Sequence, residues 1–220
     1  MNGRSWLYPL TGTLFFAVLM ASYVVVGFEY PPVATSDSIQ DVVAYYDNEG
    51  EQYLGSILQG VSCGILVFFG GYLFKRLRAS GAEASAIVTF AGAFAMALAG
   101  AIDATIAIAL TALVNGDIEA DPGAVQALSA LFGNDYVPLA MGMLLFLWGF
   151  GATIVRHRVL PKWMGWVAIV AGVTTITPAF FVAAPIALLL VLVSSIVFAR
   201  EEAREEEREE KREEKAVTIA

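Results

Sequence analysis

Long apolar stretches constrain this chain more than any other feature of its sequence. Apolar residues make up 58% of the chain and charged residues only 15%, whereas soluble domains carry about 45–50% and about 25%. A stretch of about 18 or more apolar residues with few charges is a candidate membrane-spanning helix. Four stretches meet this criterion: residues 6–28, 53–74, 86–114 and 137–155.

A fifth apolar block, residues 163–199, is too long for a single crossing. As a helix it would measure roughly 55 Å, against a hydrocarbon core of about 30 Å. Pro178 and Pro185 lie within it, and proline interrupts a helix interior. We therefore expect a hairpin with spans at 161–179 and 182–199, so that the prediction is an all-α bundle of six transmembrane helices.

The distribution of basic residues predicts the orientation of these spans, because cytoplasmic loops are enriched in Lys and Arg. The loops 29–52 and 115–136 contain neither residue, so we expect them on the outer side of the cell (inner) membrane. The 13 basic residues all lie at the opposite ends of the spans: Arg4; Lys75, Arg76 and Arg78; Arg156, Arg158 and Lys162; and six in 200–215. Both termini are therefore expected in the cytoplasm, as six crossings also require.

Several classes of function lack the residues that they need. The only histidine, His157, lies in a basic loop, and Cys63 is the only cysteine. A bis-histidine haem, a histidine zinc site or a Ser–His hydrolase would need a histidine at membrane depth. No basic patch is large enough for nucleic acid. We expect no cofactor, no metal ion and no nucleic-acid partner.

Both outer loops carry the pattern of a short amphipathic helix. Asp37 or Ser38 can cap the first helix, and Asp121 can cap the second with Pro122 at its first position. The apolar residues that share one side are Ile39, Val42, Val43 and Tyr46 in the first, and Val125, Leu128 and Phe132 in the second. These helices either cover the outer end of the bundle or form a lid or docking surface for a protein partner.

Residues 200–215 hold nine Glu and six Arg or Lys. They lack the apolar seam of a coiled coil, but oppositely charged residues four positions apart stabilise an isolated helix. We predict that the last span continues as a charged cytoplasmic helix over 200–220, separate from a transmembrane domain at 1–199. This extension is either a solvated spacer or a surface that recruits a protein partner.

One carboxylate, Asp103, interrupts the third span in the sequence "AGAIDATIA". An acid at the centre of a spanning helix costs about 2.5–3.5 kcal/mol. Small residues indicate the faces at which helices approach closely, and we expect such packing at Ala95, Ala99 and Gly100 beside the acid, and at Gly60 and Gly64 in a GxxxG motif. Asp103 is therefore expected to face the bundle interior.

Polar residues of other spans fall at a similar depth to Asp103. They are Ser22, Tyr23, Gln59, Ser62, Thr174, Thr175 and Thr177. We predict a polar layer from four helices around the acid. Asp103 either binds a proton, a cation or an amine-bearing solute, or is protonated and fixes the register of neighbouring helices.

The sequence "VRHRVLPKWMGWVAIVAGV" (155–173) joins a span that ends in basic residues to a Gly-rich span through a Leu-Pro-basic-Trp turn. It resembles a signature of small bacterial multi-pass proteins, a broad family of six-helix membrane proteins classed as a domain of unknown function. The resemblance implies a six-helix bundle and assigns no functional residues.

Three classes of function remain. The sequence favours a non-catalytic membrane component that acts through protein partners. The alternative is a small transporter or channel that uses Asp103. The second alternative is a membrane enzyme without recognisable catalytic residues.

Overall fold

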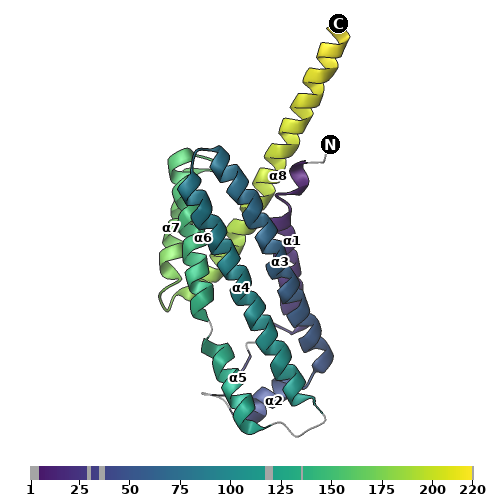
Figure 1. Cartoon of the computed structure of the whole chain (residues 1–220), viewed down its shortest axis with the longest axis vertical. Helices are drawn as coiled ribbons and strands as arrows, with labels where there is room; N and C mark the ends of the chain where they lie inside the picture. Colours follow the sequence, from purple (N-terminus) through teal and green to yellow (C-terminus); the bar gives the residue numbers. More distant parts are fainter. Residues whose placement is uncertain (1–4, 29–30, 35–37, 117–120, 135, 220) are drawn as a thin grey trace.

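The computed structural model describes residues 5–28, 31–34, 38–116, 121–134 and 136–219, with side chains as far as Arg212, and this part of the chain contains helices and no strands (Figure 1). The predicted all-α fold class is thus confirmed for the described residues. The helices are η1 (Ser5–Leu7), α1 (Thr11–Val25), α2 (Ile39–Tyr46), α3 (Glu49–Ala79), α4 (Glu83–Val114), α5 (Pro122–Asn134), α6 (Tyr136–His157), α7 (Lys162–Thr174) and α8 (Phe180–Ile219).

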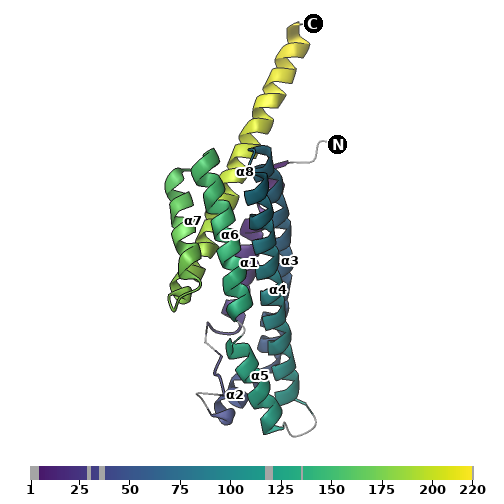
Figure 2. The ribbon, with the colours of Figure 1, turned by 60° about the vertical axis from the view of Figure 1, so that its left-hand side comes forward.

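Six of these helices form a ring around one hydrophobic core. α1, α3, α4, α6 and α7 pack against one another in that order, and α8 closes the ring by contacting both α7 and α1. The largest side chains that the core buries completely include Phe69, Phe146, Phe150 and Phe198. Viewed from two directions, the long α3–α4 hairpin extends past α7 at the end where α2 and α5 lie (Figures 1 and 2).

The two predicted amphipathic helices are confirmed as α2 and α5. Ser38 and Asp41 form a capping box at the start of α2, and the Gly123 amide donates to the Asp121 carboxylate at the start of α5 over 3.1 Å. Their apolar sides pack against α4 in a second core, the outer cluster, which consists of Val42, Tyr46, Ile106, Ala107, Leu110 and Val125. Burial there raises the pKa of the Tyr46 hydroxyl well above its usual value. The two helices thus cover one end of the bundle.

Five helical segments are long and apolar enough to cross a membrane, which makes the chain a membrane protein by length and composition: Ser5–Val25, Glu49–Ala79, Glu83–Val114, Pro122–His157 and Phe180–Arg212. The predicted span 161–179 is not among them. α7 ends at Thr174 and has 13 residues, which corresponds to about 20 Å. This helix is shorter than expected because the chain turns after Thr174.

Only one of the two prolines expected at the break lies there. The turn between α7 and α8 contains Pro178, whereas Pro185 lies inside α8, in its second turn. α8 therefore begins at Phe180, two residues before the predicted start of the last span. Pro185 is the sixth residue of α8, just past the first four amides that have no partner within a helix, and the helix continues through it.

α8 runs without interruption through 40 residues, from the ring into the charged segment. The predicted helical extension is thus confirmed as far as Ile219. We call residues 200–219 of α8 the tail. Both views show the tail projecting away from the ring at the end opposite α2 and α5 (Figures 1 and 2).

Candidate functional site

Asp103 lies in α4, 20 residues after Glu83 and 11 before Val114. It is partly buried, and the outer cluster begins three residues further on, at Ile106. Asp103 thus lies at the junction of the two cores, displaced from the middle of α4 toward the α2–α5 end.

Helices α1, α3 and α4 meet around Asp103. The Asp103 carboxylate lies near the Tyr23 hydroxyl of α1 and the Cys63 thiol of α3. One turn before Asp103, the carbonyl of Gly100 accepts a hydrogen bond from the Gln59 amide nitrogen over 3.3 Å. The structure thus brings Asp103, Gln59 and Tyr23 from the predicted polar layer into one region, together with Cys63.

The other residues of the predicted layer are satisfied locally or lie elsewhere. Ser22 and Ser62 are buried, and each donates to a carbonyl of its own helix. Thr175 donates to the carbonyl of Ala140 in α6 over 3.2 Å, and Thr174 and Thr177 donate to carbonyls three residues earlier. Because α6 stands between α7 and α4 in the ring, these threonines form a separate polar set.

The small residues beside Asp103 allow close packing on two sides of α4. A Cβ atom added to Gly100 would lie 2.7 Å from the Cys63 sulfur of α3. Ala99 is buried, and a Cβ atom added to Gly142 of α6 would lie 3.1 Å from the carbonyl carbon of Ala95. The packing face predicted on α4 therefore contacts α3 and α6.

The GxxxG motif of α3 does not pack in the same way. Among the described residues, a Cβ atom added to Gly60 or Gly64 would have no neighbour within 4 Å, so the close approach expected there is not made with any of them. The spacing of the two glycines was correct for one helix face, but that face points away from α4. Gly70, which would place a Cβ atom 2.8 Å from that of Ala93, marks the side of α3 that does contact α4.

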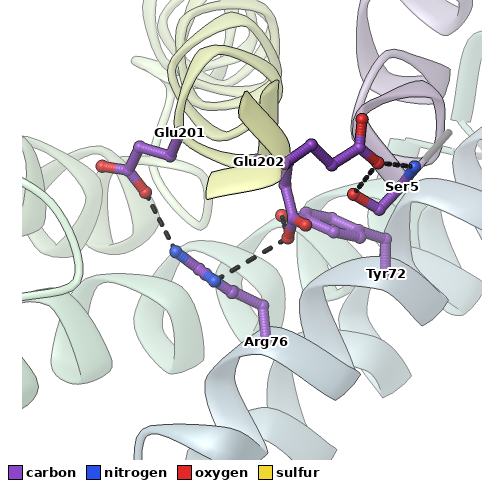
Figure 3. Close-up of polar contacts among 6 residues, drawn as sticks. Ser5, Tyr72, Arg76, Glu201 and Glu202 are labelled. Carbon is purple, nitrogen blue, oxygen red and sulfur yellow. Dashed lines mark hydrogen bonds and ion pairs between the residues drawn. The ribbon is translucent and has the colours of Figure 1, made fainter. Parts of the chain in front are cut away.

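A second polar site, which sequence reasoning missed, joins the tail to α3 (Figure 3). The Arg76 guanidinium lies 3.1 Å from the Glu201 carboxylate and 3.7 Å from that of Glu202. The Tyr72 hydroxyl donates to Glu202 over 3.1 Å. Arg76 also lies over the ring of Phe198, 5.9 Å from its centroid. We call this group, with Ser5 and Glu206, the Arg76 cluster.

The tail is also bound to the first described residues of the chain. The Ser5 hydroxyl and amide both donate to the Glu206 carboxylate, over 2.6 Å and 2.5 Å (Figure 3). η1 packs against α8. The sequence contained a signal for the contact between α3 and the tail. The basic residues after the second span and the glutamates of 200–215 after the last span were both expected on the cytoplasmic side of the membrane.

Metal ligands do not gather in either site. Within the described ranges, no three His, Cys, Asp or Glu side chains lie close enough together to hold a metal ion. The chemistry that the two sites offer is therefore that of a single carboxylate among polar groups, and of an arginine held between two glutamates.

Comparison with known proteins assigns the chain to a family. Residues 10–202 match the domain of unknown function DUF4386. No curated protein and no solved structure gives a significant match. The match ends at residue 202, so most of the tail lies outside it. The resemblance noted around residues 155–173 is confirmed over most of the chain, which belongs to the DUF4386 family of unknown function.

Proposed function

We propose that this chain is a non-catalytic membrane component that presents the tail, as a rigid charged helix, to a protein partner in the cytoplasm. The observation that carries this proposal is the continuity of α8 from the ring into the tail, combined with its attachment to α3 through Arg76. A flexible linker would let the tail sample many orientations, whereas a continuous and anchored helix holds one.

The positions of Ser5 and Glu206 support an even number of crossings in the proposed membrane domain. Ser5 is hydrogen-bonded to Glu206, so both ends lie at one end of the bundle, as an even number of crossings requires. Lys162, the first residue of α7, lines the same pocket as Glu201 of α8. At its other end, α7 is joined by a short turn after Thr174 to Phe180, the first residue of α8. α7 and its connections therefore run along most of the membrane-embedded part of α8, which supports six crossings with cytoplasmic termini.

The tail is a better partner surface than the helices at the other end. The apolar sides of α2 and α5 are used in the outer cluster, where Val42 and Val125 are fully buried. In the tail, residues 207–212 are all exposed. Arg204, Arg208 and Arg212 recur every four residues and form a basic stripe between glutamates, which suits a protein surface that carries acidic groups.

Site-specific photo-crosslinking in cells tests this proposal. A photoreactive residue in place of Arg208 is expected to form an adduct with a protein of defined mass. Charge reversal at Arg204 and Arg212 should abolish this adduct, because it removes the basic stripe. The matched control carries the probe at Phe68 of α3, which is 72% exposed and should contact lipid only. A protein adduct that persists after charge reversal, or no adduct at position 208, would contradict the proposal.

A second candidate function, a small transporter or channel for a proton, cation or amine-bearing solute, is favoured by the position of Asp103 between three helices. An acid within an apolar helix of a membrane protein commonly marks an ion or proton pathway. In reconstituted vesicles with an internal pH indicator, Asp103→Asn should abolish proton flux and leave the unfolding temperature nearly unchanged. Flux equal to that of the original protein would eliminate this candidate and leave Asp103 a structural role.

The structural role makes its own prediction for a different substitution. Asn keeps hydrogen-bonding groups at the position, whereas Leu removes all of them and leaves neighbouring polar groups without a partner. If Asp103 fixes the helix register, Asp103→Leu should lower the free energy of unfolding in detergent by about 1–3 kcal/mol, and Asp103→Asn by much less.

A further inference from the structure

A pocket of about 700 Å³ lies where the connection between α6 and α7 meets α8. Arg158 and Lys162 form its basic side, Leu160 and Val197 contribute apolar surface, and Glu201 completes the lining. The pocket is at the same end of the bundle as the Arg76 cluster, because Glu201 belongs to both.

The charge of this pocket is positive. In the described part of the chain, Glu201 and Glu202 both form ion pairs with Arg76. Arg78 pairs with Glu83 over 3.3 Å. Neither Arg158 nor Lys162 takes part in an ion pair there. Glu201 is already bound by Arg76, so it does not neutralise both remaining cations. In addition, α7 begins at Lys162, and the start of a helix favours an anion.

A second pocket, of about 400 Å³, lies further along the same pair of helices and is almost wholly apolar. Its lining includes Trp166 and Val170 of α7, and Val182 and Ile186 of α8. Residues four positions apart lie on the same side of a helix, so Lys162 lies on the same side of α7 as Trp166 and Val170. The 11 residues from Ile186 to Val197 make about three complete turns. The first pocket, which we call the basic pocket, and the second, which we call the apolar groove, therefore lie on one continuous seam between α7 and α8.

The seam has the dimensions and the order of groups of a membrane lipid. The distance along α8 from Ile186 to Val197 is about 16 Å, which is comparable with an extended acyl chain. Trp163 and Trp166 are 64% and 56% exposed on the first turns of α7, and tryptophan is enriched at the level of lipid headgroups. Basic pockets between transmembrane helices on the cytoplasmic side are a known form of headgroup site.

We propose that an anionic phospholipid binds along this seam. Arg158 and Lys162 hold the phosphate of its headgroup, and the groove beside Trp166 and Ile186 holds one acyl chain. This site is independent of the proposed partner surface, because it lies on the α7–α8 seam and uses no residue beyond Glu201. It makes the lipid a fitted component of the ring at the seam between α7 and α8.

Lipid binding to the full chain in detergent tests this proposal by native mass spectrometry. Phosphatidylglycerol should bind to the original protein more tightly than phosphatidylcholine does. The variant Arg158→Asn/Lys162→Gln should bind phosphatidylglycerol about 25-fold more weakly, about fivefold for each charge removed. Asn is chosen because Arg158 has a φ of 56°, a left-handed conformation that Asn adopts more readily than most residues.

Three further measurements keep the result decisive. The control Arg204→Gln/Arg208→Gln removes two charges from the tail and should leave lipid binding unchanged. If the double variant does not fold, Lys162→Gln alone, at an exposed position, should show the fivefold loss. Inorganic phosphate at equal concentration should not displace the lipid. Equal losses in the pocket and tail variants, no loss in the pocket variant, or displacement by inorganic phosphate would overturn the proposal.

Discussion

The two ends of the helix bundle are closed by different kinds of contact. At the α2–α5 end, the outer cluster joins three helices through buried apolar side chains, of which Val42, Leu110 and Val125 are fully buried. At the other end, the Arg76 cluster joins α3 to α8 through charged groups that are partly exposed, with 30% for Arg76 and 40% for Glu201.

This difference separates a permanent closure from an adjustable one. The stability from burying apolar surface is largely independent of salt and does not require a particular partner. An ion pair near the surface is screened by salt and is weakened by any competing charge. The outer cluster is therefore expected to hold under all physiological conditions, whereas the attachment of the tail should respond to ionic strength and to a charged partner.

Leu110→Ala should have the largest effect on this comparison. Leu110 is fully buried in the outer cluster, so its truncation leaves a cavity and should lower the free energy of unfolding by about 2–5 kcal/mol. Unfolding in detergent, followed by circular dichroism, measures the loss. Leu131→Ala removes the same atoms from an α5 residue that is 54% exposed, and should change stability by less than about 0.5 kcal/mol. Similar losses in both variants would show that this end is not closed by apolar burial.

Arg76→Gln should have an intermediate effect at the opposite end. It removes the cation between Glu201 and Glu202 and should lower stability by about 1 kcal/mol at low salt. The difference from the original protein should shrink as ionic strength rises from about 0.05 M to about 0.5 M, because screening has then already weakened the ion pairs. A loss that does not depend on salt would mean that Arg76 acts through packing on Phe198 rather than through its charge.

Arg78→Gln should have the smallest effect and serves to calibrate the comparison. Its pair with Glu83 has side chains that are 60% and 66% exposed, and such pairs contribute about 0.3 kcal/mol or less. The same unfolding measurement on Arg76→Gln and Arg78→Gln then isolates what partial burial adds to an ion pair. An equal effect of the two substitutions would remove the distinction drawn for the Arg76 cluster.

Features encoded by neighbouring residues could be predicted from the sequence. Ser38 and Asp121 cap helices because a cap needs only the next few residues. Asp121 was predicted, and Ser38 was one of two predicted caps; the other, Asp37, lies outside the described residues. The apolar sides of α2 and α5 were likewise visible in their spacing. The charged helix of the tail was predicted because its stabilising pairs are four residues apart.

Features that depend on which helices meet could not be predicted in the same way. Gly60 and Gly142 both lie among mostly small and apolar residues in the sequence. Of the two, only Gly142 approaches another backbone closely, because the ring packs α6 against Ala95 and Met96 of α4 and packs no described residue against Gly60. The contact between Arg76 and Glu201 joins residues 125 positions apart, so no local pattern contains it. For the same reason, the predicted layer around Asp103 included threonines that the ring places beyond α6.

The unbroken course of α8 has a mechanical consequence. A helix that passes from the bilayer into solution without a hinge must tilt as one body, and Arg76 holds it near the point where it leaves the ring. A small change in the inclination of its embedded half, whether caused by bilayer thickness or by the occupant of the α7–α8 seam, would swing the far tip through a larger arc. The chain thus contains the parts of a lever that pivots at the Arg76 cluster.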